Sequence, residues 1–195
     1  MYNIMYKARK KTDVYIEYHF LHKSNTYSYD TKIPILKIQN IFLELSKRFG
    51  ENNHKIHEYS IYSHDNMNLV IYMDGSNFCK NIKTSIITDP YVKDKNICTL
   101  YVEKNKVHND NFPSLYSNIV HDIIDMVFYI SDNIQCIVRT NMTYSNSKKE
   151  TIDKIGVSKN HKSNSNTWCE LYLQVDCNSN TDDVHSEIDF IYKML

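Results

Sequence analysis

The sequence predicts one α+β domain spanning residues 1–195, built on an eight-stranded antiparallel sheet that closes, or nearly closes, into a tunnel-like barrel, with about three helices. Three observations predict this class. Segments with the two-residue alternation of strands recur along the chain, turn residues separate them, and helical apolar spacing occurs in only a few places. With 195 residues, 42% of them hydrophobic, and no internal repeat or convincing linker, the chain is expected to form a single core.

The first predicted strand, residues 13–20, follows a basic segment, residues 1–11, which we expect to be a flexible N-terminus. Alternate residues of an extended strand share a face. One face of this strand carries Asp13, Tyr15, Glu17 and His19, and the other carries Val14, Ile16, Tyr18 and Phe20.

A helix is predicted over residues 35–49, where Ile35, Ile38, Phe42, Leu45 and Phe49 have helical spacing. Gly50 follows as the expected C-cap, after basic residues in the last turn. Four short strands come next, at about 56–62, 68–73, 82–88 and 97–103. The turns between them predict an antiparallel meander.

A second helix is predicted over residues 113–127, with a stripe formed by Leu115, Ile119, Ile123, Met126 and Val127. Asp122 and Asp125 would lie elsewhere on its surface. A long strand over 134–144 contains Arg139, a weaker strand covers 150–158, and residues 159–167 have the composition of a loop. The last strand, 170–176, leads into a terminal helix that Asp182 or Asp183 could cap.

The last strand repeats the pattern of the first, with Glu170, Tyr172, Gln174 and Asp176 opposite Leu171, Leu173 and Val175. An ordinary half-buried strand shows such a polar face to bulk water. A barrel with a wet lumen could instead aim both carboxylate rows at one enclosed site, where they could hold a divalent metal.

Composition excludes several classes of function. The net charge is zero, so bulk charge does not indicate nonspecific nucleic-acid binding. The five cysteines form no C-x-x-C pair, and the chain has no Gly-rich phosphate loop and no G-x-S-x-G motif. Without a secretory segment or a long apolar stretch, we expect a soluble intracellular protein with no membrane partner, in the cytoplasm, the nucleus or a virus.

The order of elements resembles the triphosphate tunnel metalloenzymes, which include the CYTH phosphohydrolases and the metal-dependent RNA triphosphatases of fungi, protists and large DNA viruses. The family's first strand carries a Glu-x-Glu motif, and here Tyr15-Ile16-Glu17 occupies that place, with His19 where a basic residue is usual. Its last strand carries a second Glu-x-Glu, which Glu170-Leu171-Tyr172 resembles. Of the four glutamates, two are present, with Tyr15 and Tyr172 at the partner positions.

The resemblance implies roles for seven residues. Glu17 and Glu170 would bind Mg²⁺ or Mn²⁺ and act in catalysis, together with Asp153 from the segment that resembles the family's Asp-bearing strand. The expected phosphate contacts are Lys83, Lys104, Arg139 and His19.

The leading functional hypothesis is a metal-dependent phosphohydrolase of the tunnel type that removes the terminal phosphate of an RNA 5′-triphosphate end, in a capping or transcription complex. The alternative is a non-catalytic tunnel-fold subunit, with an interaction or regulatory role in a viral or transcription-related assembly; the tyrosines at positions 15 and 172 favour it. A third alternative is an unrelated α+β structural protein. The substrate stays open among RNA, nucleotide, thiamine triphosphate and polyphosphate.

Each candidate residue also has a purely structural interpretation. Alternating carboxylates usually mean a solvated strand face, and Arg139 could pair with Asp153 or Glu170. Four tyrosines could form a platform for nucleobases, although amphipathic tyrosine is also a good strand residue: Tyr59, Tyr62, Tyr72 and Tyr101. His54 and His57 would face opposite sides of a strand, which argues against a metal site there.

Overall fold

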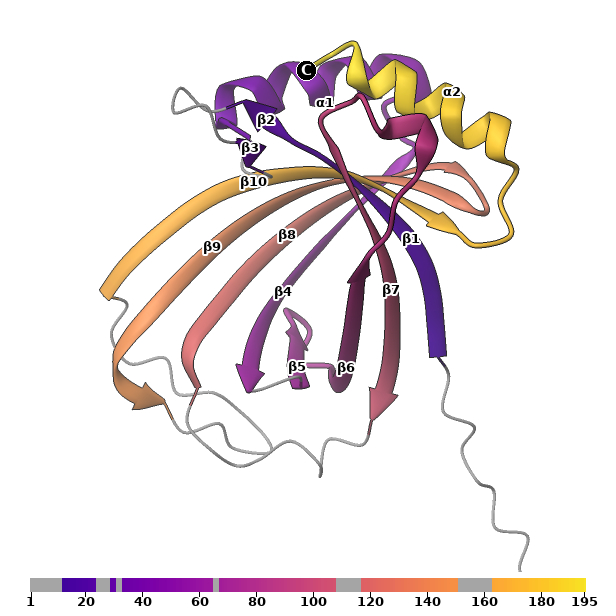
Figure 1. Ribbon diagram of the computed structural model, residues 1–195. Helices are drawn as coiled ribbons and strands as arrows, with labels where there is room; N and C mark the ends of the chain where they lie inside the picture. Colours follow the sequence, from indigo (N-terminus) through magenta and orange to yellow (C-terminus); the bar gives the residue numbers. More distant parts are fainter. Residues whose placement is uncertain (1–11, 24–28, 31–32, 65–66, 108–116, 151–162) are drawn as a thin grey trace, which may run out of the picture.

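Eight strands close into an antiparallel barrel in the order β1-β10-β9-β8-β4-β5-β6-β7. The computed structural model describes residues 12–23, 29–30, 33–64, 67–107, 117–150 and 163–195. Figure 1 shows the strands wrapping around a common lumen, with both helices lying together against one side of the barrel. The predicted fold class is therefore confirmed, and the expected flexible start, residues 1–11, lies outside the described residues.

The barrel strands are β1 (Thr12–Phe20), β4 (His54–His64), β5 (Met67–Tyr72), β6 (Asn77–Ile86), β7 (Ile97–Val107), β8 (Ser117–Ser131), β9 (Ile134–Glu150) and β10 (Ser163–Asp176). The helices are α1 (Ile35–Phe49) and α2 (Thr181–Tyr192), with a 3-10 turn, η1, at Pro90–Val92. Two short strands, β2 (His22–Lys23) and β3 (Tyr29–Asp30), pair with each other outside the barrel.

The two ends of the described chain meet where the barrel closes. Glu17 of β1 lies opposite Gln174 of β10 on one side and opposite Leu100 of β7 on the other. Because partners in an antiparallel ladder share a face, the polar faces of β1 and β10 form one continuous surface of the lumen.

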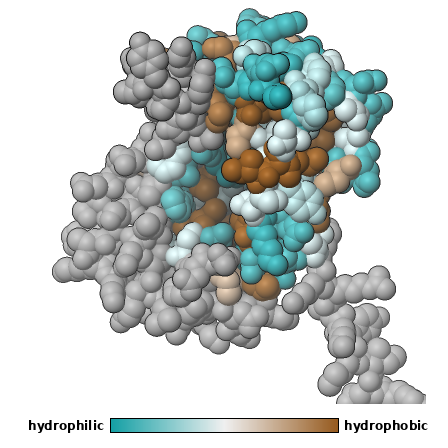
Figure 2. All heavy atoms as spheres, viewed as in Figure 1, coloured by the Kyte–Doolittle hydropathy of each residue, from teal (hydrophilic) through white to brown (hydrophobic). Residues whose placement is uncertain are grey.

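The main apolar core lies outside the lumen, between the barrel and the helices. Leu45 of α1 and Ile188 of α2 are fully buried against outward-facing barrel residues such as Phe20, Phe128 and Leu173. In Figure 2 the top of the molecule, where the helices lie in Figure 1, is largely polar, and apolar side chains gather below it. Strands β1, β8, β9 and β10 therefore have apolar residues on the helix side, which leaves their other faces free to be polar.

The C-terminal end of α1 was predicted correctly, and the start of α2 was not. Gly50 is the C-cap of α1 at φ 90°, and its N–H bonds the carbonyl of Ser46, as expected. At α2 the predicted cap was wrong. The N-cap is Asn180, whose side chain accepts from the N–H of Asp182, and Asp182 and Asp183 occupy the first turn instead.

The predicted helix over residues 113–127 is also wrong, because residues from Ser117 to Ser131 form strand β8. Strand β10 begins at Ser163, so part of the predicted loop over 159–167 is strand as well. The weak strand expected at 150–158 falls outside the described residues except for Glu150, where β9 ends. Two helices, rather than about three, are present in the described chain. No helix of that part is long and apolar enough to cross a membrane.

Candidate functional site

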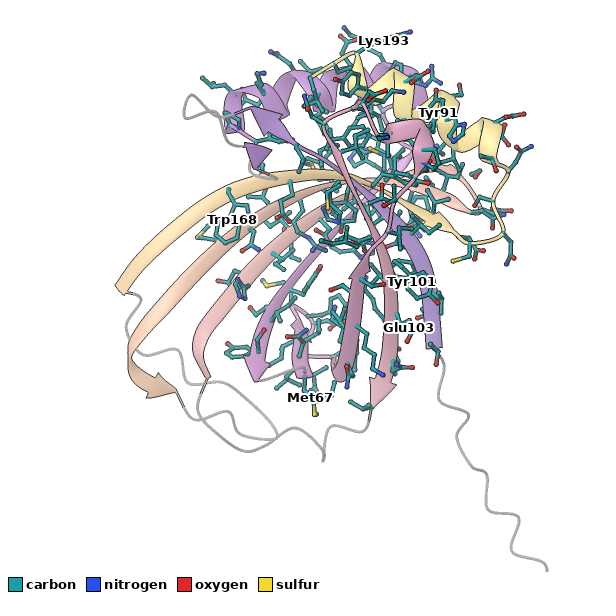
Figure 3. All side chains as sticks on the ribbon, in the orientation of Figure 1. Met67, Tyr91, Tyr101, Glu103, Trp168 and Lys193 are labelled. Carbon is teal, nitrogen blue, oxygen red and sulfur yellow. The ribbon has the colours of Figure 1, made fainter. Side chains whose placement is uncertain are left out.

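The lumen contains a cavity of about 280 Å³. All eight barrel strands contribute side chains to its walls, so the cavity exists only when the sheet is closed. Figure 3 shows how densely the side chains of the described residues fill the space between the strands. The cavity lining combines four cationic side chains, Lys80, Lys104, Lys106 and Arg139, with the carboxylates of Asp13 and Asp125 and with five tyrosine and phenylalanine rings.

A buried ion pair crosses one wall of the cavity. Arg139 of β9 lies directly opposite Asp125 of β8, and its Nε and Nη2 donate to the two carboxylate oxygens at 2.8 Å each. The Tyr59 hydroxyl donates to the same carboxylate at 2.6 Å and accepts from Arg139 at 3.1 Å. Burial by itself would raise the pKa of Asp125, but the hydrogen bonds and charge of Arg139 hold it below its ordinary value. This bidentate pair fixes the guanidinium in place.

Glu17 is buried in the middle of β1 and is already engaged by two basic side chains. Its Oε2 lies 2.8 Å from His19 Nε2, and its Oε1 lies 3.8 Å from Lys104 Nζ. Burial would raise the pKa of Glu17, but the hydrogen bond with His19 and the charge of Lys104 lower it overall. The His19 ring also stacks on Tyr172 of the neighbouring strand, with centroids 4.7 Å apart.

Three lysines line the β6–β7 side of the cavity. Lys80 lies directly opposite Lys106 in the ladder, and Lys104 follows two residues away on the same face. Like charges placed directly opposite each other on a sheet are destabilising. Burial, followed by the charges of Lys104 and Arg139, lowers the pKa of Lys80 to about 7. No salt bridge joins Lys80 to a carboxylate of the described chain, whereas Lys104 is paired with Glu17.

Tyr15 and Tyr172, which the sequence resemblance places at glutamate positions of the family motifs, pack against two cationic side chains of the lumen. Lys104 Nζ lies 4.5 Å from the centroid of the Tyr15 ring, and the guanidinium carbon of Arg139 lies 5.3 Å from that of Tyr172. Burial raises the pKa of both phenols, so they stay neutral. These rings attract cations through their π faces, whereas a carboxylate would offer two oxygen ligands to a metal.

The residues present do not form a ready metal centre. Among the described residues, no group of three or more His, Cys, Asp or Glu side chains is arranged to hold a metal ion. Glu17 has its oxygens directed at His19 and Lys104, and Asp125 is chelated by Arg139. A divalent cation would have to displace these partners, so the expectation of a resident Mg²⁺ or Mn²⁺ finds no fit in the described residues.

Structural comparison identifies the fold. The chain superimposes on the Mimivirus capping enzyme triphosphatase with a TM-score of 0.61 at 9% identity, covering 93% of this chain and 88% of the other. A second Mimivirus structure, of the RNA triphosphatase domain of a trifunctional mRNA capping enzyme, gives 0.56 at 12% identity with the same coverage. The S. pombe RNA triphosphatase Pct1 gives 0.53 at 9% identity, covering 92% and 77%. The chain has the RNA triphosphatase tunnel fold. The sequence matches no protein-family model, and no curated protein is significantly similar to it.

Four of the predicted site residues line the cavity or contact its lining, and one lies on the outer face of the barrel. Arg139 and Lys104 line the cavity, and Glu17 and His19 contact its lining. Glu170 lies opposite Arg139 and shares a strand face with Tyr172, beyond the cavity itself. Lys83 is exposed on β6, three residues from Lys80 and therefore on the other face of the strand. Asp153 lies outside the described residues.

Sequence reasoning missed several tunnel residues. Lys80 and Phe78 were missed because β6 begins at Asn77, whereas the predicted strand began at 82. Asp125 was missed because it was placed on a helix that is strand β8. The signal in β8 is its wealth of β-branched residues, which favours a strand covered on both faces.

Proposed function

We propose that the tunnel binds the triphosphate end of an RNA. The proposal depends chiefly on Lys80, Lys106 and Lys104, which line one side of the tunnel cavity, two of them directly opposite each other. A phosphate chain would neutralise these charges, and the fixed guanidinium of Arg139 provides a further contact from the β9 side. The fold likeness to capping-enzyme triphosphatases supports RNA 5′ ends among triphosphate-bearing ligands.

The binding test compares one short RNA with a 5′-triphosphate or a 5′-monophosphate end. Each charge-assisted hydrogen bond contributes about 1.5–3 kcal/mol, so we expect the triphosphate form to bind at least about tenfold more tightly. Lys80→Met should remove most of this preference. Lys83→Met, on the outer face of the same strand, is the matched control and should leave it unchanged. Equal affinity for the two RNAs would contradict the proposal.

Hydrolysis of the terminal phosphate is a second candidate function. Glu17 and Glu170 are retained on the inward faces of β1 and β10, and both could help to position a water or a substrate-bound cation. Against it, Tyr15 and Tyr172 stand where further carboxylates are expected, and Glu17 is engaged by His19 and Lys104. The rival function is a non-catalytic module that recognises RNA ends within a capping or transcription assembly.

Phosphate release from triphosphate RNA, with and without manganese, separates these two functions. Manganese-dependent release that Glu170→Ala abolishes would support the hydrolase. Binding of triphosphate RNA without any release would support the recognition module instead.

A further inference from the structure

Three aromatic rings form a continuous surface on one side of the tunnel. Tyr59 of β4, Tyr72 of β5 and Phe78 of β6 come from neighbouring strands and all line the cavity. The ring centroids of Tyr59 and Tyr72 are 5.6 Å apart, and those of Tyr72 and Phe78 are 6.0 Å apart. Val70, buried and also in the lining, lies opposite Phe78 in the ladder. We call these three rings the aromatic wall.

The aromatic wall is anchored at one end by hydrogen bonds, and part of its ring surface faces the cavity. The Tyr59 hydroxyl is bonded to both Asp125 and Arg139, which fixes one end of the row. Tyr72 and Phe78 are only half-buried, so ring surface remains open to the cavity. Apolar ring faces exposed in a charged, hydrated lumen are costly unless a ligand covers them.

The lysine row lies directly beside the aromatic wall. Lys80 follows Phe78 by two residues, on the same face of β6, and Lys106 Nζ lies 4.8 Å from the centroid of the Phe78 ring. A ligand that spans both surfaces must therefore carry anionic charge at one end and a flat aromatic group close to it. A nucleotide has this arrangement, and inorganic polyphosphate does not.

Only part of the tyrosine platform suggested by the sequence is real. Tyr62 is buried in a separate cluster with Leu69 and Cys79. Tyr101 lies on the outer face of β7, because it is an odd number of residues from the inward-facing Val102 and Lys104. Tyr59 and Tyr72 face the lumen, and Phe78 completes the row. The wall thus meets the requirement for a base-stacking surface, which is aromatic residues on adjacent strands with basic neighbours.

We infer that the aromatic wall stacks the base of the nucleotide whose triphosphate occupies the lysine row, so that the tunnel selects nucleotide ends over inorganic polyphosphate. This inference rests on the proposed function, because it assumes a triphosphate in the tunnel. It adds that the first nucleoside enters the lumen with its phosphates.

The test measures binding of ATP and of inorganic tripolyphosphate by calorimetry, with EDTA and again with magnesium. Stacking of one base on aromatic side chains corresponds to about a fivefold to hundredfold gain in affinity. We expect ATP to bind more tightly than tripolyphosphate by a factor in this range. Tyr72→Leu and Phe78→Leu should each reduce ATP affinity about fivefold or more while leaving tripolyphosphate affinity within about twofold. Phe78→Tyr should preserve the preference.

Tyr101→Leu on β7 is the matched control and should leave both affinities unchanged. Circular dichroism and melting curves establish that each variant is folded. Equal affinity for ATP and tripolyphosphate in the wild type, or leucine variants that weaken both ligands alike, would overturn the aromatic wall as a base site while leaving the proposed function intact. Failure of both ligands to bind in either buffer would overturn the proposed function and this inference together.

Discussion

At the scale of single residues, the tunnel differs from a metal centre in what its carboxylates contact. Glu17 and Asp125 each face a cation within the protein. The rings of Tyr15 and Tyr172 lie against two of these cations. Lys80 has no such partner among the described carboxylates. The charge that the tunnel leaves unsatisfied is therefore positive, which favours an anionic ligand.

The low pKa of Lys80 predicts how anion binding depends on pH. Because this pKa is about 7, the ammonium form becomes more populated as the pH falls through 7, and the affinity for tripolyphosphate should rise. Lys80→Met should remove the part of the pH dependence that comes from Lys80. The part that comes from titration of the ligand itself should remain, because both proteins bind the same ligand. Calorimetry across this pH range checks it, and identical pH profiles for the two proteins would refute the assignment.

Arg139 predicts a stability effect. Arg139→Met leaves Asp125 buried without its cation, which should cost about 3 kcal/mol in the free energy of unfolding. The control is Lys47→Met, which breaks an exposed pair with Glu44 and should cost less than about 1 kcal/mol. Urea unfolding measures both, and equal losses would show that the Arg139 pair is not a buried, stabilising one.

At the scale of elements, some strands and helices can be predicted from their sequences more clearly than others. Strand β1 was predicted almost to its ends because its polar and apolar residues alternate strictly, and α1 because a C-cap glycine closes a regular apolar stripe. Strand β8 was not predicted as a strand, because one of its faces packs beneath the helices and the other faces the lumen. Its apolar residues on both faces also satisfy helical spacing. Asp125 was missed for this reason, whereas Lys80 was missed because the predicted strand began at 82 and β6 begins at Asn77.

Helix α1 stabilises the barrel from outside, and this can be measured along a single element. Leu45→Ala removes a fully buried side chain from the core beneath the helices and should cost about 3 kcal/mol in unfolding free energy. Leu43→Ala changes a side chain of the same helix that is 55% exposed, and should cost less than about 0.5 kcal/mol. Chemical denaturation gives both values, and a similar cost at the two sites would mean that α1 does not pack as described.

At the scale of the whole molecule, closure of the barrel creates the site. Strands from both ends of the chain pair with each other, and residues distant in sequence, such as Glu17, Lys80 and Arg139, come to share one lumen. The predicted closed sheet is confirmed, although the predicted order of elements had a helix where β8 lies. The family resemblance named Glu17, Lys104 and Arg139, which lie on or beside the lumen wall. The sequence could not predict which face each lysine takes, because a shift of one residue in strand phase exchanges lumen for solvent.

The most direct measurement is a crystal structure of the protein with inorganic tripolyphosphate, which places the phosphates without reference to turnover. We predict phosphate oxygens inside the tunnel, within hydrogen-bond distance of Lys80 and Lys104. An anion bound only on the outer face, beside Lys83, or no bound anion at a concentration that saturates binding in solution, would contradict the account.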